Sequence, residues 1–397
     1  MLNEDDTKLV NLPNMSRRGL FRASGAVLGG LSLMSLVGAA VAETAGVAPL
    51  EPLLMPGREN PVRVNFNENA LGMSPKAQAA AREAIAKAFR YADAEVAALK
   101  ELIANMYGLS TEHVLMTHGS AEGIRAGIAA HAGNDVQFVG TELTYDDGPR
   151  HAGYAGMNIV LVPHKEDFSF DIDAMKKVVD AHKGASVVYL VNPNNPTSTI
   201  TPSDEIEGWI KSKPANTVFI VDEAYAEFAD DPAFRSVDGL IKAGLDNVLL
   251  LKTFSKIYAM AGMRMGYVLA TPSNIEKLSR FVGTEDLNYC GACAAAESLQ
   301  DKEFLALSKS TNLQSRKIIT DVLDELGLAY LPSQTNFIFH RIHGRLEDYR
   351  KAMRDEHVLV GRKFPPADEW CRLSMGTPAE MAYVANAMRK LRANGAV

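Results

Sequence analysis

Short apolar runs alternate with amphipathic segments along the chain from about residue 113 onward. The runs are rich in Val, Ile and Leu, and most of them end in polar or glycine-containing stretches. Buried parallel strands give near-continuous apolar runs of this kind, and amphipathic segments between them are typical of helices that cover a sheet. The runs predict a parallel or mixed sheet with both faces covered, with strands at 113–117, 136–139, 159–162, 186–191, 217–221, 248–251 and 266–270.

The pattern is different before this region. Residues 43–62 are rich in proline and small residues, which predicts an irregular lead-in. Ser74-Pro75 then marks the start of an alanine-rich helix that we expect to reach about Arg90, because serine is a good cap and proline fits the first helical position.

The pattern changes again after about residue 300. A long helical pattern covers 303–327, and shorter strand-like and helical segments lead to a final helix from about Pro378. We therefore predict an α/β fold with a large domain and a smaller α+β domain. The predicted division is an N-terminal segment that joins the smaller domain at 43–75, the large domain at 76–302 and the smaller domain at 303–397.

The first 42 residues predict an export signal. Arg17-Arg18 precede an uncharged, modestly apolar stretch over 23–42, and this stretch ends in Ala40-Val41-Ala42, which a signal peptidase accepts. This order resembles a twin-arginine signal, which implies the twin-arginine export machinery as a partner, cleavage after Ala42 and a periplasmic or secreted enzyme. Twenty uncharged residues could instead form an uncleaved membrane anchor, but their glycine and serine content weakens that interpretation. After cleavage we expect no stable membrane insertion.

Composition narrows the class of protein further. The chain has 397 residues, 47% of them hydrophobic, and a net charge of −7. These values are typical of a folded globular protein of enzyme size. The acidic balance argues against a nucleic-acid partner, because phosphate binding needs clustered Lys and Arg. Three cysteines cannot build a disulfide framework.

Four polar segments each follow a predicted strand, where open α/β sheets bind their ligands. In the first, 117–122, a strand runs through a glycine into a helix, and the backbone N–H groups of Ser120 and Ala121 could bind an anion. In the second, 191–197, asparagines and prolines form a polar loop from which Asn195 could donate a hydrogen bond. Taken singly, a plain strand–helix turn and an Asn/Pro turn remain alternatives.

The other two segments carry charge. Asp222 follows a buried strand, where a carboxylate is costly without a cation or hydrogen bonds, although it could simply cap the next turn. Lys256 also follows an apolar run, and desolvation there would lower its pKa and favour nucleophilic amine chemistry. A surface lysine whose stem covers apolar neighbours is the alternative. The four segments in this order favour one shared site.

Together these segments resemble the fold-type I pyridoxal-phosphate (PLP) aminotransferases of class I/II, in particular their histidinol-phosphate aminotransferase-like branch. Ser255-Lys256, with Arg264 eight residues after the lysine, is the most specific part of the resemblance. The resemblance extends over nearly the whole chain after the export segment. Further matching segments lie at 64–69, 90–93, 144–145, 334–337 and 371–377.

The resemblance implies a role in cofactor chemistry for each matching residue. Lys256 would form a Schiff base with PLP and shuttle the proton during transfer. Asp222 would pair with the pyridine nitrogen and keep the ring electron-withdrawing. Tyr225 and Asn195 would hydrogen-bond the ring's phenolate oxygen, and Tyr145 would stack on the ring. Lys256, Asp222 and Tyr225 are therefore the predicted catalytic residues.

The same resemblance implies a phosphate site and a partner subunit. The PLP phosphate would bind the backbone amides of Ser120 and Ala121, together with Ser255 and the Arg264 guanidinium. Tyr91 would reach the phosphate in the neighbouring subunit, so that a homodimer would complete each site.

The resemblance also implies a substrate site, and this sequence departs from the branch at several positions near it. Arg372 would bind the substrate carboxylate in a bidentate pair, although it could instead form a structural salt bridge between domains. Asn67 and Arg362 complete the predicted substrate site, but Arg362 stands one position later than the arginine of the branch. Ser198 replaces the usual glycine of the asparagine–proline loop, and alanine replaces proline after Tyr91.

The predicted function is transfer of the amino group of an α-amino acid, or related amine, to a 2-oxo acid by ping-pong half-reactions. Three alternatives stay open: another PLP reaction such as decarboxylation, elimination or oxidation; histidinol-phosphate aminotransfer, which is expected in the cytosol; and a non-catalytic amino-acid-binding protein. A binding protein has no need for the lysine.

Two other features have simpler interpretations. Cys290 and Cys293 form one Cys-x-x-Cys pair, which cannot close a tetrahedral zinc site by itself, so no metal is predicted. Helix packing is the favoured interpretation of the pair, although an oxidising compartment would permit a disulfide. His118, next to the predicted anion-binding turn, is interpreted as a local hydrogen-bonding residue.

Overall fold

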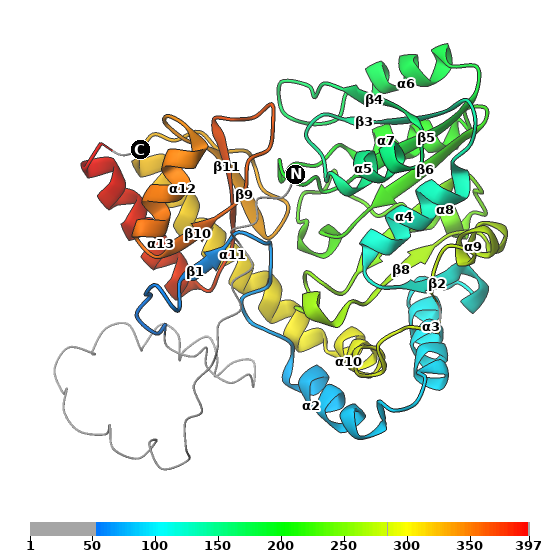
Figure 1. Cartoon of the computed structure of the whole chain (residues 1–397), viewed down its shortest axis with the longest axis horizontal. Coiled ribbons are helices and arrows are strands. Elements are labelled where there is room, and N and C mark those ends of the chain that lie inside the picture. Colours follow the sequence, from blue (N-terminus) through cyan, green and yellow to red (C-terminus); the bar gives the residue numbers. More distant parts are fainter. Residues whose placement is uncertain (1–52, 284, 396–397) are drawn as a thin grey trace. The chain divides into compact units, whose positions relative to one another are not determined.

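The computed structural model describes residues 53–283 and 285–395 (Figure 1). The predicted export signal, 1–42, lies outside the described residues. In the part of the chain that is described, no helix has both the length and the apolar character needed to cross a membrane.

A seven-stranded sheet organises the large domain. Its strands are β2 (Val114–Thr117), β3 (Val136–Thr141), β4 (Asn158–Val162), β5 (Ala185–Val191), β6 (Thr217–Asp222), β7 (Val248–Thr253) and β8 (Gly266–Leu269). Their order across the sheet is β2-β8-β7-β6-β5-β3-β4. Only β8 runs against its neighbours, because its pairings with β2 and with β7 are both antiparallel. The predicted α/β fold with a mostly parallel sheet is confirmed.

Both faces of this sheet are buried, as the apolar runs predicted. In β7, Leu249 and Leu251 belong to one hydrophobic core, whereas Val248 and Leu250 belong to the other. Successive side chains of a strand point to opposite faces, so two cores require two helical layers. One layer contains α4 (Ser120–His131), α5 (Asp147–Tyr154) and α9 (Pro272–Ser279), and the other contains α2 (Pro75–Ala84), α3 (Asp93–Tyr107), α6 (Ile172–Ala181), α7 (Ser203–Lys211), α8 (Asp238–Lys242) and α10 (Tyr289–Gln300).

The smaller domain has a separate hydrophobic core. Its helices are α11 (Lys302–Glu325), α12 (Leu346–Asp355) and α13 (Pro378–Ala393), and its antiparallel strands are β9 (Phe337–Arg341) and β11 (Trp370–Ser374). The N-terminal strand β1 (Val62–Val64) pairs in parallel with β10 (Val358–Val360), which ties the start of the described chain to this domain. Val62 and Val64 are buried in the smaller domain's core.

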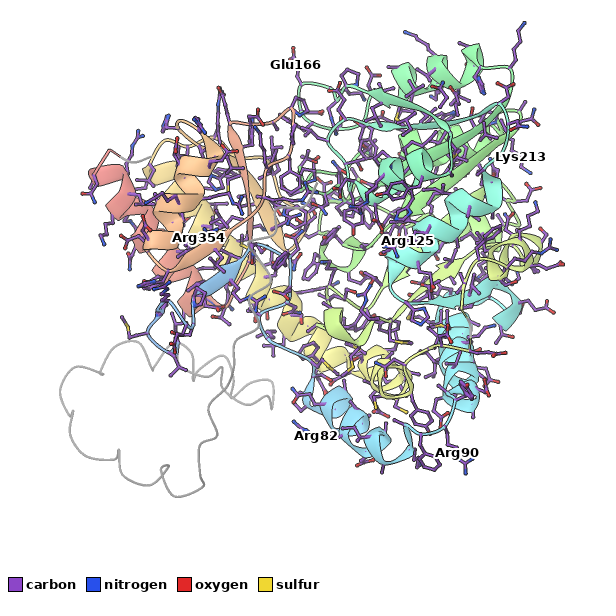
Figure 2. The ribbon with its side chains drawn as sticks, viewed as in Figure 1. Arg82, Arg90, Arg125, Glu166, Lys213 and Arg354 are labelled. Atoms are coloured by element: carbon purple, nitrogen blue, oxygen red, sulfur yellow. The ribbon has the colours of Figure 1, made fainter. Side chains whose placement is uncertain are left out.

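The first helix is shorter than the sequence predicts. Ser74 caps α2 through a hydrogen bond from the Ala77 N–H, as expected, but the α-helix ends at Ala84 and gives way to a 3₁₀ turn, η2 (Ile85–Lys87). Ile85 and Phe89 are 66% and 76% exposed, so no core stabilises a longer helix here. Charged side chains such as Arg82, Glu166 and Lys213 lie at the periphery (Figure 2).

Candidate active site

A cavity of about 380 Å³ lies where strands of the large sheet end and where the smaller domain meets them. Twelve of the thirteen predicted site residues line it. The exception is Tyr91, which is 75% exposed on the connection between η2 and α3. The twelve are Asn67, Ser120, Ala121, Tyr145, Asn195, Asp222, Tyr225, Ser255, Lys256, Arg264, Arg362 and Arg372.

Asp222 is the most deeply placed charge of the cavity. It ends β6 with 2% of its surface exposed, and its Oδ1 accepts a hydrogen bond of 3.0 Å from the Ala224 N–H. Burial raises the pKa of Asp222 to about 7, against which that hydrogen bond and the charge of Lys256 act only in part. A carboxyl group in this position favours a cationic partner inside the cavity.

Lys256 supplies an amine to the same cavity. Its Nζ donates hydrogen bonds to the carbonyl oxygens of Asn67, at 3.2 Å, and Phe66, at 3.4 Å. Burial and the nearby charge of Arg372 lower the pKa of Lys256 to about 8. Near neutral pH, a useful fraction of the amine is therefore neutral and nucleophilic.

Tyr225 presents a protonated phenol beside the lysine. Its Oη accepts a 3.1 Å hydrogen bond from Asn67 Nδ2, which leaves its own proton free to donate, and its ring packs edge-on against Phe337. Burial raises the pKa of Tyr225 to about 12, so the phenol stays neutral. Asn67 is itself fixed, because Ser374 Oγ accepts from its N–H and donates to its Oδ1.

Tyr145 lines the cavity from the loop that follows β3. Burial, reinforced by the nearby carboxylates of Asp147 and Asp222, raises the pKa of Tyr145 to about 12. Its ring is therefore also neutral at physiological pH.

An anion-binding cradle lies at the junction of β2 and α4. Gly119 adopts φ 79° there and offers no side-chain cap, so the first N–H groups of the helix, at Ser120 and Ala121, are available to an anion. Arg264 Nη2 donates to His118 O at 2.9 Å. A Cβ at position 119 would lie 2.7 Å from that nitrogen, so only glycine permits this approach.

Ser255 completes the cradle with a hydroxyl held by Thr253, whose Oγ1 donates to Ser255 Oγ at 3.0 Å. This donor set suits a phosphate: helix amides, a hydroxyl and a guanidinium. The cradle, the amine and the buried carboxyl group together fit PLP, which carries a phosphate, an aldehyde and a basic ring nitrogen.

Arg372 brings a buried positive charge from β11. Nη1 donates to Asn195 Oδ1 at 2.8 Å, and Nη2 donates to Asn65 O at 2.7 Å, while Nε is buried without a partner among the described residues. Both partners are neutral oxygens, which argues against a structural salt bridge. Burial lowers the pKa of Arg372 to about 10, so the group stays charged near neutral pH.

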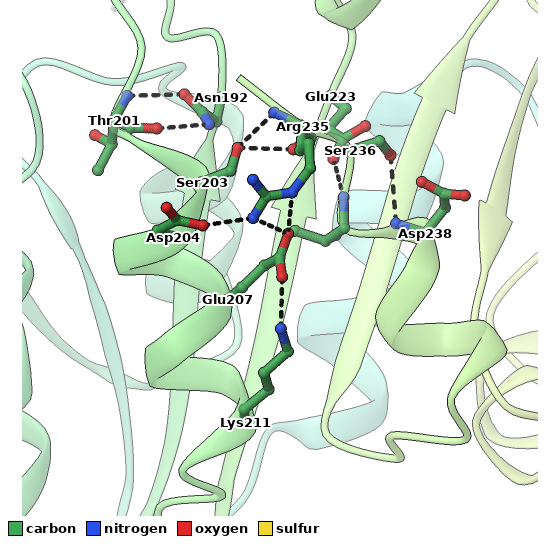
Figure 3. A network of polar contacts seen from close by, with 11 residues as sticks. Asn192, Thr201, Ser203, Asp204, Glu207, Lys211, Glu223, Arg235, Ser236 and Asp238 are labelled. Carbon is green, nitrogen blue, oxygen red and sulfur yellow. Dashed lines mark hydrogen bonds and ion pairs between the residues drawn. The ribbon is translucent and has the colours of Figure 1, made fainter. Parts of the chain in front are cut away.

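Asn195 is held in a loop that is fixed from outside the cavity. Asn192, at the start of this loop, exchanges two 3.0 Å hydrogen bonds with the backbone of Thr201 (Figure 3). Since Asn195 Oδ1 accepts from Arg372, its amide group keeps Nδ2 as the donor for a ligand. Asn195 therefore connects Arg372 of the smaller domain to the loop that follows β5 of the large sheet.

Three charged residues meet at the cavity mouth. Arg362 lines the cavity in spite of its shifted sequence position, and its Nη2 lies 2.9 Å from Asp146 Oδ2. Arg150, whose guanidinium bonds to Asp147, also lines the cavity. Asp146 and Arg150 were not among the predicted site residues; the only sequence signal for Asp146 is its position directly after Tyr145.

The remaining predictions concern residues outside this donor set. His118 bonds locally, with Nδ1 2.8 Å from Glu122 Oε2 and Nε2 3.1 Å from Asp286 O, as expected. Cys290 and Cys293 are free thiols near the start of α10. Within residues 53–283 and 285–395, no three His, Cys, Asp or Glu side chains are grouped to hold a metal ion.

The sheet and this donor set define a fold-type I PLP enzyme. Comparison with known proteins is more specific: the family model described as "Aminotransferase class I and II" matches residues 60–388. The chain therefore belongs to the class I and II aminotransferase family, and it is a PLP-dependent aminotransferase.

Its relatives are similar over most of their length. The histidinol-phosphate aminotransferase of Anaeromyxobacter sp. (strain Fw109-5) is 34% identical over 87% of this chain and 96% of its own. A crystal structure of a putative histidinol-phosphate aminotransferase from Erwinia carotovora atroseptica is 52% identical, with a TM-score of 0.86, over 87% of this chain and 100% of its own. The PLP complex of a Sinorhizobium meliloti histidinol-phosphate aminotransferase is 27% identical, with a TM-score of 0.76, over 95% and 99% of the two chains.

Proposed function

We propose that this aminotransferase moves the amino group of an α-amino acid to a 2-oxo acid, with Arg372 binding the α-carboxylate of both substrates. The observation that carries the proposal is the buried guanidinium of Arg372, which faces the cavity of Lys256 and has only neutral oxygen partners. A carboxylate is the group that such a guanidinium binds best, in a bidentate pair.

The residues of the cavity divide the catalytic work. When bound, PLP supplies an aldehyde for the amino group and an electron-withdrawing ring that stabilises negative charge at Cα. With PLP bound, the amine of Lys256 would hold the cofactor, and as a free base it would carry the proton of the substrate's Cα. Asp222 would keep the ring nitrogen protonated, Tyr225 would donate to the ring's oxygen, and the cradle at Ser120 would hold the phosphate.

Exchange of Arg372 tests the substrate proposal. Arg372→Gln should raise KM for amino acid and 2-oxo acid about 100-fold, because a charge-assisted pair in a buried site is worth several kcal/mol. Arg354→Gln, on an exposed arginine of α12, is the control and should leave both KM values unchanged. An unchanged KM in Arg372→Gln, with nitrogen transfer intact, would contradict the proposal.

Histidinol phosphate is a second candidate substrate. It is favoured by the names of the relatives described above and by Arg362, a second guanidinium in the cavity that could bind a phosphate. A screen of amino acids and histidinol phosphate separates the two candidates. The visible spectrum of the bound cofactor reports each amino donor directly, and the proposal expects the fastest conversion with an α-amino acid.

We further propose a homodimer in which Tyr91 serves the site of the other subunit. Tyr91 and Phe89, two positions apart, are 75% and 76% exposed. Two exposed aromatic side chains so close together are typical of a surface that another protein covers. A second copy of the chain would cover them.

Export by the twin-arginine route is the last part of the proposal. The family match begins at residue 60, so residues 1–42 precede the catalytic fold. Joint replacement of Arg17 and Arg18 by lysine should strand the enzyme in the cytoplasm, whereas Arg22→Lys, just outside the pair, should export normally. Normal periplasmic levels of the double variant would rule this route out.

A further inference from the structure

The two arginines at the cavity mouth already have acidic partners from the large domain. Arg362, which follows β10 of the smaller domain, pairs with Asp146, and the two side chains are 50% and 48% exposed. Arg150 bonds to Asp147, which is buried at the start of α5. Arg372 differs from both, because its hydrogen-bond partners are neutral.

Arg362 is also a close neighbour of the proposed carboxylate anchor. Its Cζ lies 4.4 Å from the centroid of the Phe364 ring, and the Cζ of Arg372 lies 4.9 Å from the same centroid. Phe364 is buried, so both guanidinium groups contact a fixed ring. Both arginines also line the same cavity, so a small substrate held by Arg372 can extend its distal group toward Arg362.

The charge at this distal position is set by Asp146. An anionic distal group would have to displace the Asp146 carboxylate from Arg362 and then lie beside the displaced charge. An uncharged distal group leaves the ion pair intact. Charge repulsion of this kind against the disfavoured ligand is a common source of specificity.

We propose that Asp146 is a specificity-determining residue: it holds Arg362 as an internal counter-ion and so selects substrates whose distal group carries no negative charge. The inference rests on the proposed role of Arg372 as the anchor of the α-carboxylate. It deepens the proposed function by favouring amino acids with neutral side chains over acidic or phosphorylated ones.

A pair of near-isosteric ligands tests this inference on the holoenzyme. Glutarate carries two carboxylates, and glutaramate replaces one of them by an amide, so their ratio of dissociation constants isolates the distal charge. Asp146→Asn should shift this ratio about tenfold in favour of glutarate, as measured by calorimetry. Kinetics with glutamate and glutamine as donors should show the same shift in kcat/KM.

Two further variants make the outcome specific. If Asp146 acts through Arg362, the shift should shrink at least threefold when Asp146→Asn is combined with Arg362→Gln. Asp368→Asn is the matched control. Asp368 pairs with Lys363 in the loop that contains Arg362, is about as exposed as Asp146, and does not line the cavity. Its exchange should leave the ratio of dissociation constants within twofold of the wild-type value. An unchanged ratio in Asp146→Asn, or an equal shift with and without Arg362, would overturn the inference.

The dissociation constants of the two ligands also distinguish failure of this inference from failure of the proposed function on which it rests. If Arg372 is not the anchor, Arg372→Gln binds both ligands as tightly as the wild type. If the anchor is correct and only Asp146 is misassigned, Arg372→Gln weakens both ligands while Asp146→Asn leaves their ratio unchanged.

Discussion

Asp222 and Lys256 face one cavity, and burial shifts their pKa values towards each other, to about 7 and about 8. For Asp222 the folded value lies above the ordinary carboxyl value, so the folded protein binds this proton more tightly than the unfolded chain does. The stability that this proton gives is complete below about pH 4 and is lost as the pH rises to about 7. Above that pH, the cofactor-free fold contains a buried carboxylate for which the Ala224 hydrogen bond and the charge of Lys256 offset only part of the cost of burial.

Asp222→Asn should therefore stabilise the cofactor-free protein. We expect its free energy of unfolding at pH 8 to exceed that of cofactor-free wild type by on the order of a few kcal/mol, with little difference near pH 4. Urea unfolding at both pH values measures this. Asp173→Asn, on a side chain that is 84% exposed, is the control and should change stability by less than about 0.5 kcal/mol. Destabilisation at pH 8 would contradict the electrostatic account of this residue.

Ser198 carries backbone strain in the loop of Asn195. It takes φ 65°, the left-handed conformation that the sequence departure from glycine made costly, and its hydroxyl is buried without a partner in the described chain. Ser198→Gly should raise the free energy of unfolding by about 1 kcal/mol. Gly244→Ser places a side chain at φ 79° in open space and should lower it by a similar amount. Equal signs for the two variants in thermal unfolding would show that strain is not the cause.

At the scale of elements, the junction of β2 and α4 connects backbone geometry to cofactor binding. Gly119→Ala would force Arg264 away from His118 and narrow the cradle, so PLP should bind at least tenfold more weakly. Gly72→Ala introduces a side chain at a similar φ of 69° with no atom within 4 Å, at a residue that does not line the cavity. Fluorescence titration with PLP should separate the two variants, and equal affinities would mean that the cradle does not hold the phosphate.

The sequence predicts individual helices and strands better than it predicts which of them pair or which of their side chains come into contact. All seven strands of the large sheet stand where apolar runs predicted them, because a strand buried on both faces needs such a run. The parallel pairing of β1 with β10 has no local signal, since its register depends on contacts between distant segments. The same limit applies to the site: motifs identified Lys256 and Asp222, whereas Asp146 becomes significant only once Arg362 is seen beside it.

At the scale of the whole molecule, the dimer proposal makes each site depend on two chains. If Tyr91 acts in the partner's site, mixing Lys256→Ala with Tyr91→Ala rebuilds one intact site in each mixed dimer. Random pairing should then restore about a quarter of wild-type activity, although each variant alone is nearly inactive. Subunit exchange followed by a transamination assay measures the recovery. No recovery from mixed dimers would place Tyr91 in its own subunit's site or outside catalysis.

We infer that the amine of Lys256 holds PLP in the cavity that it lines together with Asp222. Borohydride reduction of the holoenzyme, followed by peptide mapping, tests it most directly. Lys252 is the internal control: it lies four residues earlier, is buried outside the cavity lining, and pairs with Glu227 at 2.8 Å and with Glu223 at 3.4 Å. We expect a pyridoxyl adduct on Lys256 and none on Lys252. An adduct on Lys252, or a full adduct yield in Lys256→Ala, would contradict it.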